Sequence, residues 1–230
     1  MYKVCLLPSK KSLRIVEFIA GLLLMAVQQT AIADWATPSN SLISVKSIEV
    51  KQQRFSGQIA RRFNAWKNLI INLQNKSIPE KLKAVNDFFN MFEYVNDDSY
   101  QGASDYWKTP DEFIIDGGGD CEDFSIAKYF TLLAVDVPMD TLRITYVKSL
   151  ELNQAHMVLT FYPEPGAEPL ILDNLMTKIL PASQRKDLVP VYSFNSKGVW
   201  MTQQQGKEHS LGNASRLGKW QSVVQRMQQR

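Results

Sequence analysis

Residues 117–123 read Gly-Gly-Gly-Asp-Cys-Glu-Asp, which places one thiol directly after three glycines and among three carboxylates. At a helix N-terminus, unpaired backbone N–H groups and the helix dipole favour a thiolate, so Cys121 is a candidate nucleophile. The carboxylates of Asp120, Glu122 and Asp123 would raise the thiol pKa by like-charge repulsion. A bound cation would resolve this conflict, so the segment suggests both a nucleophile and a metal site. The alternative is a capped helix with a structural cysteine and a solvated acidic face.

A catalytic thiol needs a base, and the chain contains two histidines. His156 lies in a strand-like apolar run and is the stronger candidate, because His209 lies in a polar stretch. A second apolar run ends at Asp173. If the two runs pair symmetrically about the Pro-rich turn at 163–166, His156 lies diagonally across from Asp173, which can then orient the imidazole. A structural histidine and a turn-forming aspartate are the alternative interpretation.

Hydrophobic periodicity predicts the elements that would hold these residues. Apolar residues three or four positions apart, with capping signals, predict helices at 55–73, 79–94, 110–115, 120–134 and 216–227. Short β-rich runs predict strands at 142–147, 155–162 and 170–173, and a further hairpin of 192–194 and 199–202. Helices followed by antiparallel strands indicate an α+β domain, with the nucleophile helix packed on the sheet.

The first 33 residues have the features of a secretory signal peptide. A basic start precedes the apolar run 18–27, and small residues at 31–33 suit cleavage before Asp34. We therefore expect a leader at 1–33, a single domain at 34–230 and no membrane insertion after cleavage. An uncleaved anchor is the minor alternative, because the apolar run has about half of the ~20 residues that a bilayer requires.

Loss of the leader changes the cysteine count and the charge. It removes Cys5, so Cys121 would be the only cysteine and no internal disulfide could form. It also removes four basic residues and one acidic residue from the 26 and 23 of the whole chain, which leaves 22 of each. The net charge of the mature chain is therefore balanced, and it does not indicate a basic surface that would bind nucleic acid.

Three segments resemble the LapG family, which comprises periplasmic, calcium-dependent, transglutaminase-like cysteine proteases of bacteria. They are Gly118 to Phe124, the run His156-Met157-Val158-Leu159 and the run Leu172-Asp173-Asn174-Leu175. The resemblance covers most of the mature chain and extends to Trp107, Thr109, Pro110, Glu112, Arg185, Asp187, Leu188, Tyr192 and Ser193. It implies a papain/transglutaminase-like fold and hydrolysis of a peptide bond by a Cys-His-Asp triad.

The resemblance also assigns roles to single residues. Cys121 would be the nucleophile, His156 the general base and then acid, and Asp173 the orienting carboxylate. Asp120, Glu122 and Asp123 would bind Ca2+, whose preference is for hard oxygen ligands. Three carboxylates are too few for a full calcium shell, so backbone carbonyls, water or Asp105 would have to complete it.

The substrate and regulator also come from the resemblance. Family members cleave the N-terminal region of a large outer-membrane-retained adhesin at a pair of alanines, which releases the adhesin and promotes biofilm dispersal. They are held inactive by the periplasmic domain of an inner-membrane cyclic di-GMP receptor.

Trp107 could assist an oxyanion through its indole N–H, although packing is the first interpretation. Transglutaminase or amidase chemistry, and a non-catalytic calcium-dependent binding module, stay open as alternative functions.

Overall fold

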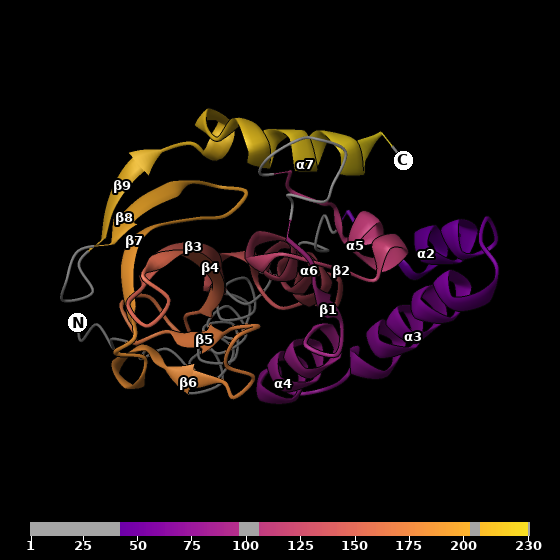
Figure 1. Cartoon of the computed structure of the whole chain (residues 1–230), viewed down its shortest axis with the longest axis horizontal. Coiled ribbons are helices and arrows are strands. Elements are labelled where there is room, and N and C mark those ends of the chain that lie inside the picture. The colour runs from indigo at the N-terminus through magenta and orange to yellow at the C-terminus, as the bar shows by residue number, and fades with distance from the viewer. Residues whose placement is uncertain (1–41, 97–105, 203–207, 230) are drawn as a thin grey trace, which may run out of the picture. The chain divides into compact units, whose positions relative to one another are not determined.

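The computed structural model describes residues 42–96, 106–202 and 208–229 (Figure 1). The predicted leader and Asp105 lie outside these ranges. The helices are α2 (Val45–Gln52), α3 (Gly57–Leu73), α4 (Ile78–Phe89), α5 (Pro110–Asp116), α6 (Cys121–Ala134) and α7 (Gly218–Gln228). Within the described ranges, none of these helices has the length and apolar character needed to cross a bilayer.

The main sheet of the described chain has the strand order β6-β5-β4-β3-β7-β8-β9, and every neighbouring pair is antiparallel. Its strands are β3 (Leu142–Ser149), β4 (Gln154–Phe161), β5 (Leu170–Leu172), β6 (Leu180–Pro181), β7 (Leu188–Phe194), β8 (Val199–Thr202) and β9 (Glu208–Gly212). This combination of helices and an antiparallel sheet confirms the predicted α+β class.

Helix α6 is the centre of the fold. It packs against β4 and also against α4 and α5, and Figure 1 shows it between the strands and the N-terminal helices. Every residue from Asp123 to Leu133 is buried, as expected for a helix enclosed on all sides. Trp220 of α7 stacks on Phe130 with ring centroids 5.4 Å apart, so α7 covers a further side of α6. Cys121, the first residue of α6, is therefore anchored to the core.

The glycines before Cys121 allow close contact between two parts of the backbone. Gly117 ends α5 with a φ of 83°, a left-handed conformation that favours glycine. Gly118 and Gly119 form β2, which pairs in parallel with β1 (Glu93–Tyr94). A Cβ on Gly118 would lie 2.1 Å from the Glu93 carbonyl oxygen, so any side chain there would separate the strands. Gly118 therefore serves a close approach between two segments of the chain's own backbone.

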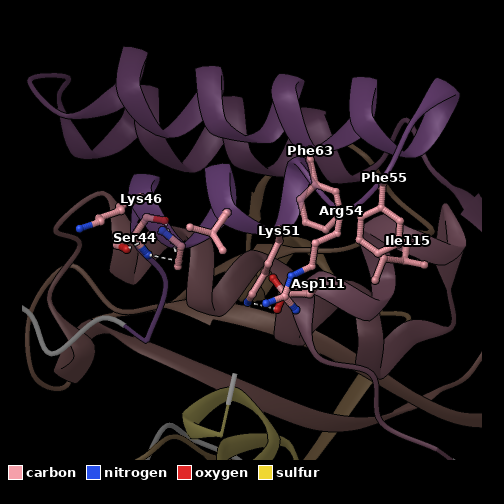
Figure 2. Close-up of a pocket in the computed structure, with 10 residues that line it drawn as sticks. Ser44, Lys46, Lys51, Arg54, Phe55, Phe63, Asp111 and Ile115 are labelled. Atoms are coloured by element: carbon pink, nitrogen blue, oxygen red, sulfur yellow. Dashed lines mark hydrogen bonds and ion pairs between the residues drawn. The ribbon is translucent and has the colours of Figure 1, made fainter.

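Helices α2 and α3 contact α5 beside a groove of about 540 Å³. Figure 2 shows Lys51 of α2 pointing to Asp111 of α5, with which it forms an ion pair and a hydrogen bond. Phe63 of α3 and Ile115 of α5 also line the groove, on its apolar side. These contacts fix α5, whose C-terminus leads through the glycines to Cys121.

Several predicted boundaries were wrong. The helix expected at 79–94 ends at Phe89, because residues 93–94 leave it to pair with the glycines. The strand expected at 192–194 begins at Leu188 and pairs with β3 along its length. Helix α2 and the edge strands β6 and β9 were not predicted, because they are short and their apolar pattern is weak. The helix containing Cys121 and the strand containing His156 were predicted to within two residues at either end.

Candidate active site

Cys121 lies at the start of α6, directly after the N-cap residue Asp120. The cysteine is half-buried, and its Sγ donates a hydrogen bond of 3.0 Å to Oε2 of Glu122. Cys121, Glu122 and His156 line one cleft of about 400 Å³. The structure thus brings the predicted nucleophile and the predicted base to the same cavity, although they are 35 positions apart in the sequence.

His156 and Asp173 meet across neighbouring strands. Leu159 of β4 pairs with Leu172 of β5, which is the register expected from symmetric pairing about the Pro-rich turn. In this register His156 Nε2 lies 2.8 Å from Asp173 Oδ1, and both residues are buried. When Nε2 carries the proton that it donates to Asp173, Nδ1 is the basic nitrogen of the ring.

The Asp173 carboxylate has a donor on each oxygen. Oδ1 also accepts a hydrogen bond of 3.0 Å from the backbone N–H of Leu175, and Oδ2 accepts one of 2.7 Å from Nη2 of Arg185. Burial raises the pKa of Asp173, but the bond with His156 and the Arg185 guanidinium outweigh burial and lower it to about 2. Asp173 is therefore an anion, as an orienting carboxylate must be.

The thiol has a different environment. Burial, and then the negative charge of Glu122, raise the pKa of Cys121 well above its ordinary value, while a hydrogen bond with the backbone of Met157 opposes the rise. The conflict seen in the sequence is thus present in the fold, where burial and the Glu122 carboxylate together raise the pKa of the thiol. A thiolate here needs a positive charge nearby, either on His156 or on a bound cation.

The three acidic residues around Cys121 point to different partners. Asp123 accepts a hydrogen bond of 2.7 Å from the backbone N–H of Lys108, and the Lys108 ammonium lies 3.3 Å from its other oxygen. Burial raises the pKa of Asp123 to about 7, against the lowering effect of Lys108. Glu122 faces the thiol, and the side chain of Asp120 is buried. Across the described ranges, no three His, Cys, Asp or Glu side chains converge as a metal site would require.

Aromatic side chains form the rest of the cleft wall. Trp107 is buried and stacks on Phe194 at 5.8 Å, which confirms its packing role, and it also lines the cleft. Tyr146 and Tyr192 stack at 5.2 Å on adjacent strands and line the same cleft. Sequence reasoning assigned no role to these tyrosines, to Arg185 or to Lys108. Cross-strand pairing of 146 with 192 could have indicated the tyrosine pair, but only a known register reveals it.

The fold and the cleft are those of a transglutaminase-like cysteine protease, and comparisons with known proteins agree. The profile of the bacterial transglutaminase-like cysteine proteinases (BTLCP) matches residues 61–208. The chain belongs to this family, and it is a cysteine protease. Family membership decides between the enzyme and the non-catalytic binding module in favour of the enzyme.

Solved structures give a closer relationship. LapG of Legionella pneumophila is 55% identical and superposes with a TM-score of 0.74, covering 81% of this chain and 99% of that one. An EGTA-treated form of that protein gives 55% identity, a TM-score of 0.75 and the same coverage. A calcium-bound form gives 56% identity and a TM-score of 0.73, covering 80% and 99% of the two chains. No curated protein matches the sequence. The resemblance to the LapG family is therefore confirmed.

Proposed function

We propose that this protein is a calcium-dependent periplasmic endopeptidase. Its substrate is the N-terminal region of a large outer-membrane-retained adhesin, cut at a pair of alanines, and the cut releases the adhesin and promotes biofilm dispersal. The observation that carries the peptidase activity is the 2.8 Å contact of His156 with Asp173 at the cleft that also contains Cys121. The similarity to LapG supports the choice of substrate.

The reaction begins when Nδ1 of His156 takes the proton of the Cys121 thiol. The sulfur attacks the carbonyl carbon of the scissile peptide, and a covalent bond to the acyl group forms. The imidazolium then gives its proton to the leaving amine, so the C–N bond breaks. Water, deprotonated by the same imidazole, attacks the thioester carbonyl, the C–S bond breaks and the acid leaves, and the imidazolium returns its proton to the Cys121 thiolate. Asp173 holds Nε2 throughout and stabilises the imidazolium.

Asp120, Glu122 and Asp123 are the proposed calcium ligands. Their oxygens suit a hard cation, but Asp123 already binds Lys108, so backbone carbonyls, water or Asp105, which lies outside the described residues, would have to complete the shell. The calcium-bound form of LapG supports an ion in this protein too. When bound, calcium would supply positive charge beside Glu122 and so offset the effect of that carboxylate on the thiol.

Localisation and regulation follow from the same proposal. The leader at 1–33 would direct the protein to the periplasm, where the adhesin N-terminus lies. The periplasmic domain of an inner-membrane receptor that senses cyclic di-GMP would hold the protease inactive. No nucleic acid partner is expected.

Cleavage of a candidate adhesin tests the proposal. Mature protein is incubated with the adhesin N-terminal region, with calcium or with EGTA, and products are identified by mass spectrometry. We expect a single cut at paired alanines that is lost with EGTA, with Cys121→Ala and with His156→Ala. His209→Ala is the matched control and should cut normally, because this second histidine lies on β9 and outside the segments that resemble the LapG family.

Three results would contradict parts of the proposal. Unchanged cutting by Cys121→Ala would exclude the thiol mechanism. Unchanged cutting in EGTA would exclude the calcium dependence alone. Transfer of an added amine to the acyl product, seen as its added mass, would show that the enzyme works as a transglutaminase.

A further inference from the structure

We propose that Arg185 is a positioning residue of the protease, which acts on the reaction only through Asp173 and His156. The inference rests on the proposed triad. Arg185 directly follows a short 3-10 helix (Ala182–Gln184), outside the sheet, and no described contact joins it to Cys121. It nevertheless reaches the carboxylate that holds the base.

Arg185 completes the set of donors around Asp173. Its Nη2 donates to Oδ2, while His156 and the Leu175 backbone share Oδ1. With both oxygens engaged, rotation of the carboxylate about its Cβ–Cγ bond would break at least one of these bonds. The orientation of Oδ1 fixes the ring of His156, and the ring fixes which nitrogen serves the thiol. The guanidinium therefore determines the geometry of the base from one residue away.

Asp187 holds Arg185 in place. Asp187 accepts bonds of 3.0 Å from Nε and 2.8 Å from Nη2 of Arg185, so one guanidinium joins two carboxylates. Arg185 is 3% exposed, and a cation so buried is stable only when paired and hydrogen-bonded. A bidentate fork of this kind suits arginine and not lysine. The four side chains form one row, Asp187-Arg185-Asp173-His156, in which Asp187 is partly exposed and the other three are buried.

The location of Arg185 separates positioning from substrate contact. Arg185 lines a cavity of about 850 Å³ together with Val158 and Ile171. The residues lining the cleft of Cys121 do not include it. A substrate bound at Cys121 would therefore meet His156 but not the guanidinium. Removal of Arg185 should change the rate of the chemical step and leave substrate binding nearly unaltered.

Kinetics of Arg185→Met and Arg185→Lys on the mapped adhesin fragment test the inference. We expect kcat to fall about 10- to 100-fold for Arg185→Met with KM changed less than about twofold, because only the transition state loses support. In the plot of kcat against pH, the acid limb should move to higher pH, because the pKa of Asp173 rises when the Arg185 cation beside it is removed. Arg185→Lys should restore the acid limb and part of kcat. Asp187→Asn should cause a smaller loss of the same kind.

Arg143→Met is the matched control. Arg143 lines the same cavity as Arg185 and is stacked between Tyr162 at 4.7 Å and Trp200 at 4.1 Å, so its loss removes one cation and its packing without touching Asp173. We expect a lower melting temperature, a normal kcat and an unmoved acid limb.

Two outcomes would overturn the inference. One is a normal kcat and acid limb for Arg185→Met in a preparation where Asp173→Asn is inactive. The other is equal losses for Arg185→Met and Arg143→Met with no shift of the acid limb, which would indicate a general structural role. If Arg185→Met does not fold, Arg185→Lys and Asp187→Asn decide by the same readouts. Full activity of Asp173→Asn would instead refute the triad, and so the proposed function.

Discussion

On the histidine side of the cleft, each oxygen of the orienting carboxylate has a buried donor, whereas on the cysteine side the thiol faces a carboxylate. The pKa of Asp173 is lowered to about 2, and that of Cys121 is raised. Both residues lie at the edge of the same core, so burial acts on both. The difference arises from the neighbours, which are His156 and Arg185 in one case and Glu122 in the other. The histidine side is already preorganised, and the cysteine side requires a positive charge on His156 or on a bound cation.

Asp173→Asn should have the largest effect, because it breaks the preorganised side. In the variant, the amide NH2 would replace one carboxylate oxygen and would face other donors. These are Arg185 on one side, or His156 and the backbone N–H of Leu175 on the other. With the NH2 toward His156, the ring must place its proton on Nδ1, which is the wrong tautomer for a base. We expect kcat to fall on the order of 10³–10⁴-fold, as for other triad aspartates, with the melting temperature as a folding check.

A double variant sharpens this prediction. Asp173→Asn with Arg185→Met removes the donor that opposes the amide, so the amide oxygen can face the imidazole while its NH2 faces Met. We expect the double variant to be more active than Asp173→Asn alone. If the fold-loss of kcat in the double variant equals the product of the losses in the two single variants, the two residues do not act as a unit.

The acid dependence of stability tests the same side without kinetics. Asp173 has a folded pKa of about 2 against roughly 3.9 in an unfolded chain. The ionised Asp173 therefore contributes about 2–3 kcal/mol to the free energy of unfolding. This contribution is fully present at a pH above the unfolded pKa, and it is lost as the pH falls through the folded pKa. When both proteins are unfolded with urea, wild type should have a larger free energy of unfolding than Asp173→Asn at about pH 5. This difference should decrease by the same amount between about pH 5 and pH 2. A constant difference would contradict the prediction.

Lys128 tests how much buried charge the centre of the fold tolerates. Lys128 on α6 is 1% exposed, and burial lowers its pKa to about 7 despite the opposing effects of Asp173 and Asp87. The unfolded chain thus binds this proton more tightly, so the lysine destabilises the fold increasingly as the pH falls from about 10 to 7. Lys128→Met should raise the free energy of unfolding by up to about 4 kcal/mol at pH 7. The gain should vanish near pH 10, and Lys83→Met, at an exposed position of α4, should show none.

Local patterns predicted the parts of the site that local structure determines. Capping and periodicity placed Cys121 at a helix start, and symmetry about the turn placed His156 beside Asp173, because an antiparallel register with a known turn allows few pairings. The fold class followed from the order of helices and strands.

The remaining features depend on contacts between distant segments. Arg185 reaches Asp173 from a loop, Lys108 reaches Asp123 from before α5, and residues 93–94 leave their helix to pair with glycines. No periodicity encodes such contacts. The calcium ligands stay a prediction, because the carboxylates around Cys121 do not converge among the described residues and Asp105 lies outside them.

The smallest effect is expected on the cysteine side, from Glu122→Gln. The change removes the charge and leaves the size, so the pKa of Cys121 should fall. Alkylation of Cys121 by iodoacetamide in EGTA should then be faster at neutral pH, by up to about tenfold, because the thiolate is the reactive form. Glu164→Gln, in the exposed turn between β4 and β5, should alkylate at the wild-type rate. An unchanged rate for Glu122→Gln would mean that burial alone holds the thiol protonated. A faster rate would mean that neutralising one carboxylate suffices, which is the effect proposed for calcium.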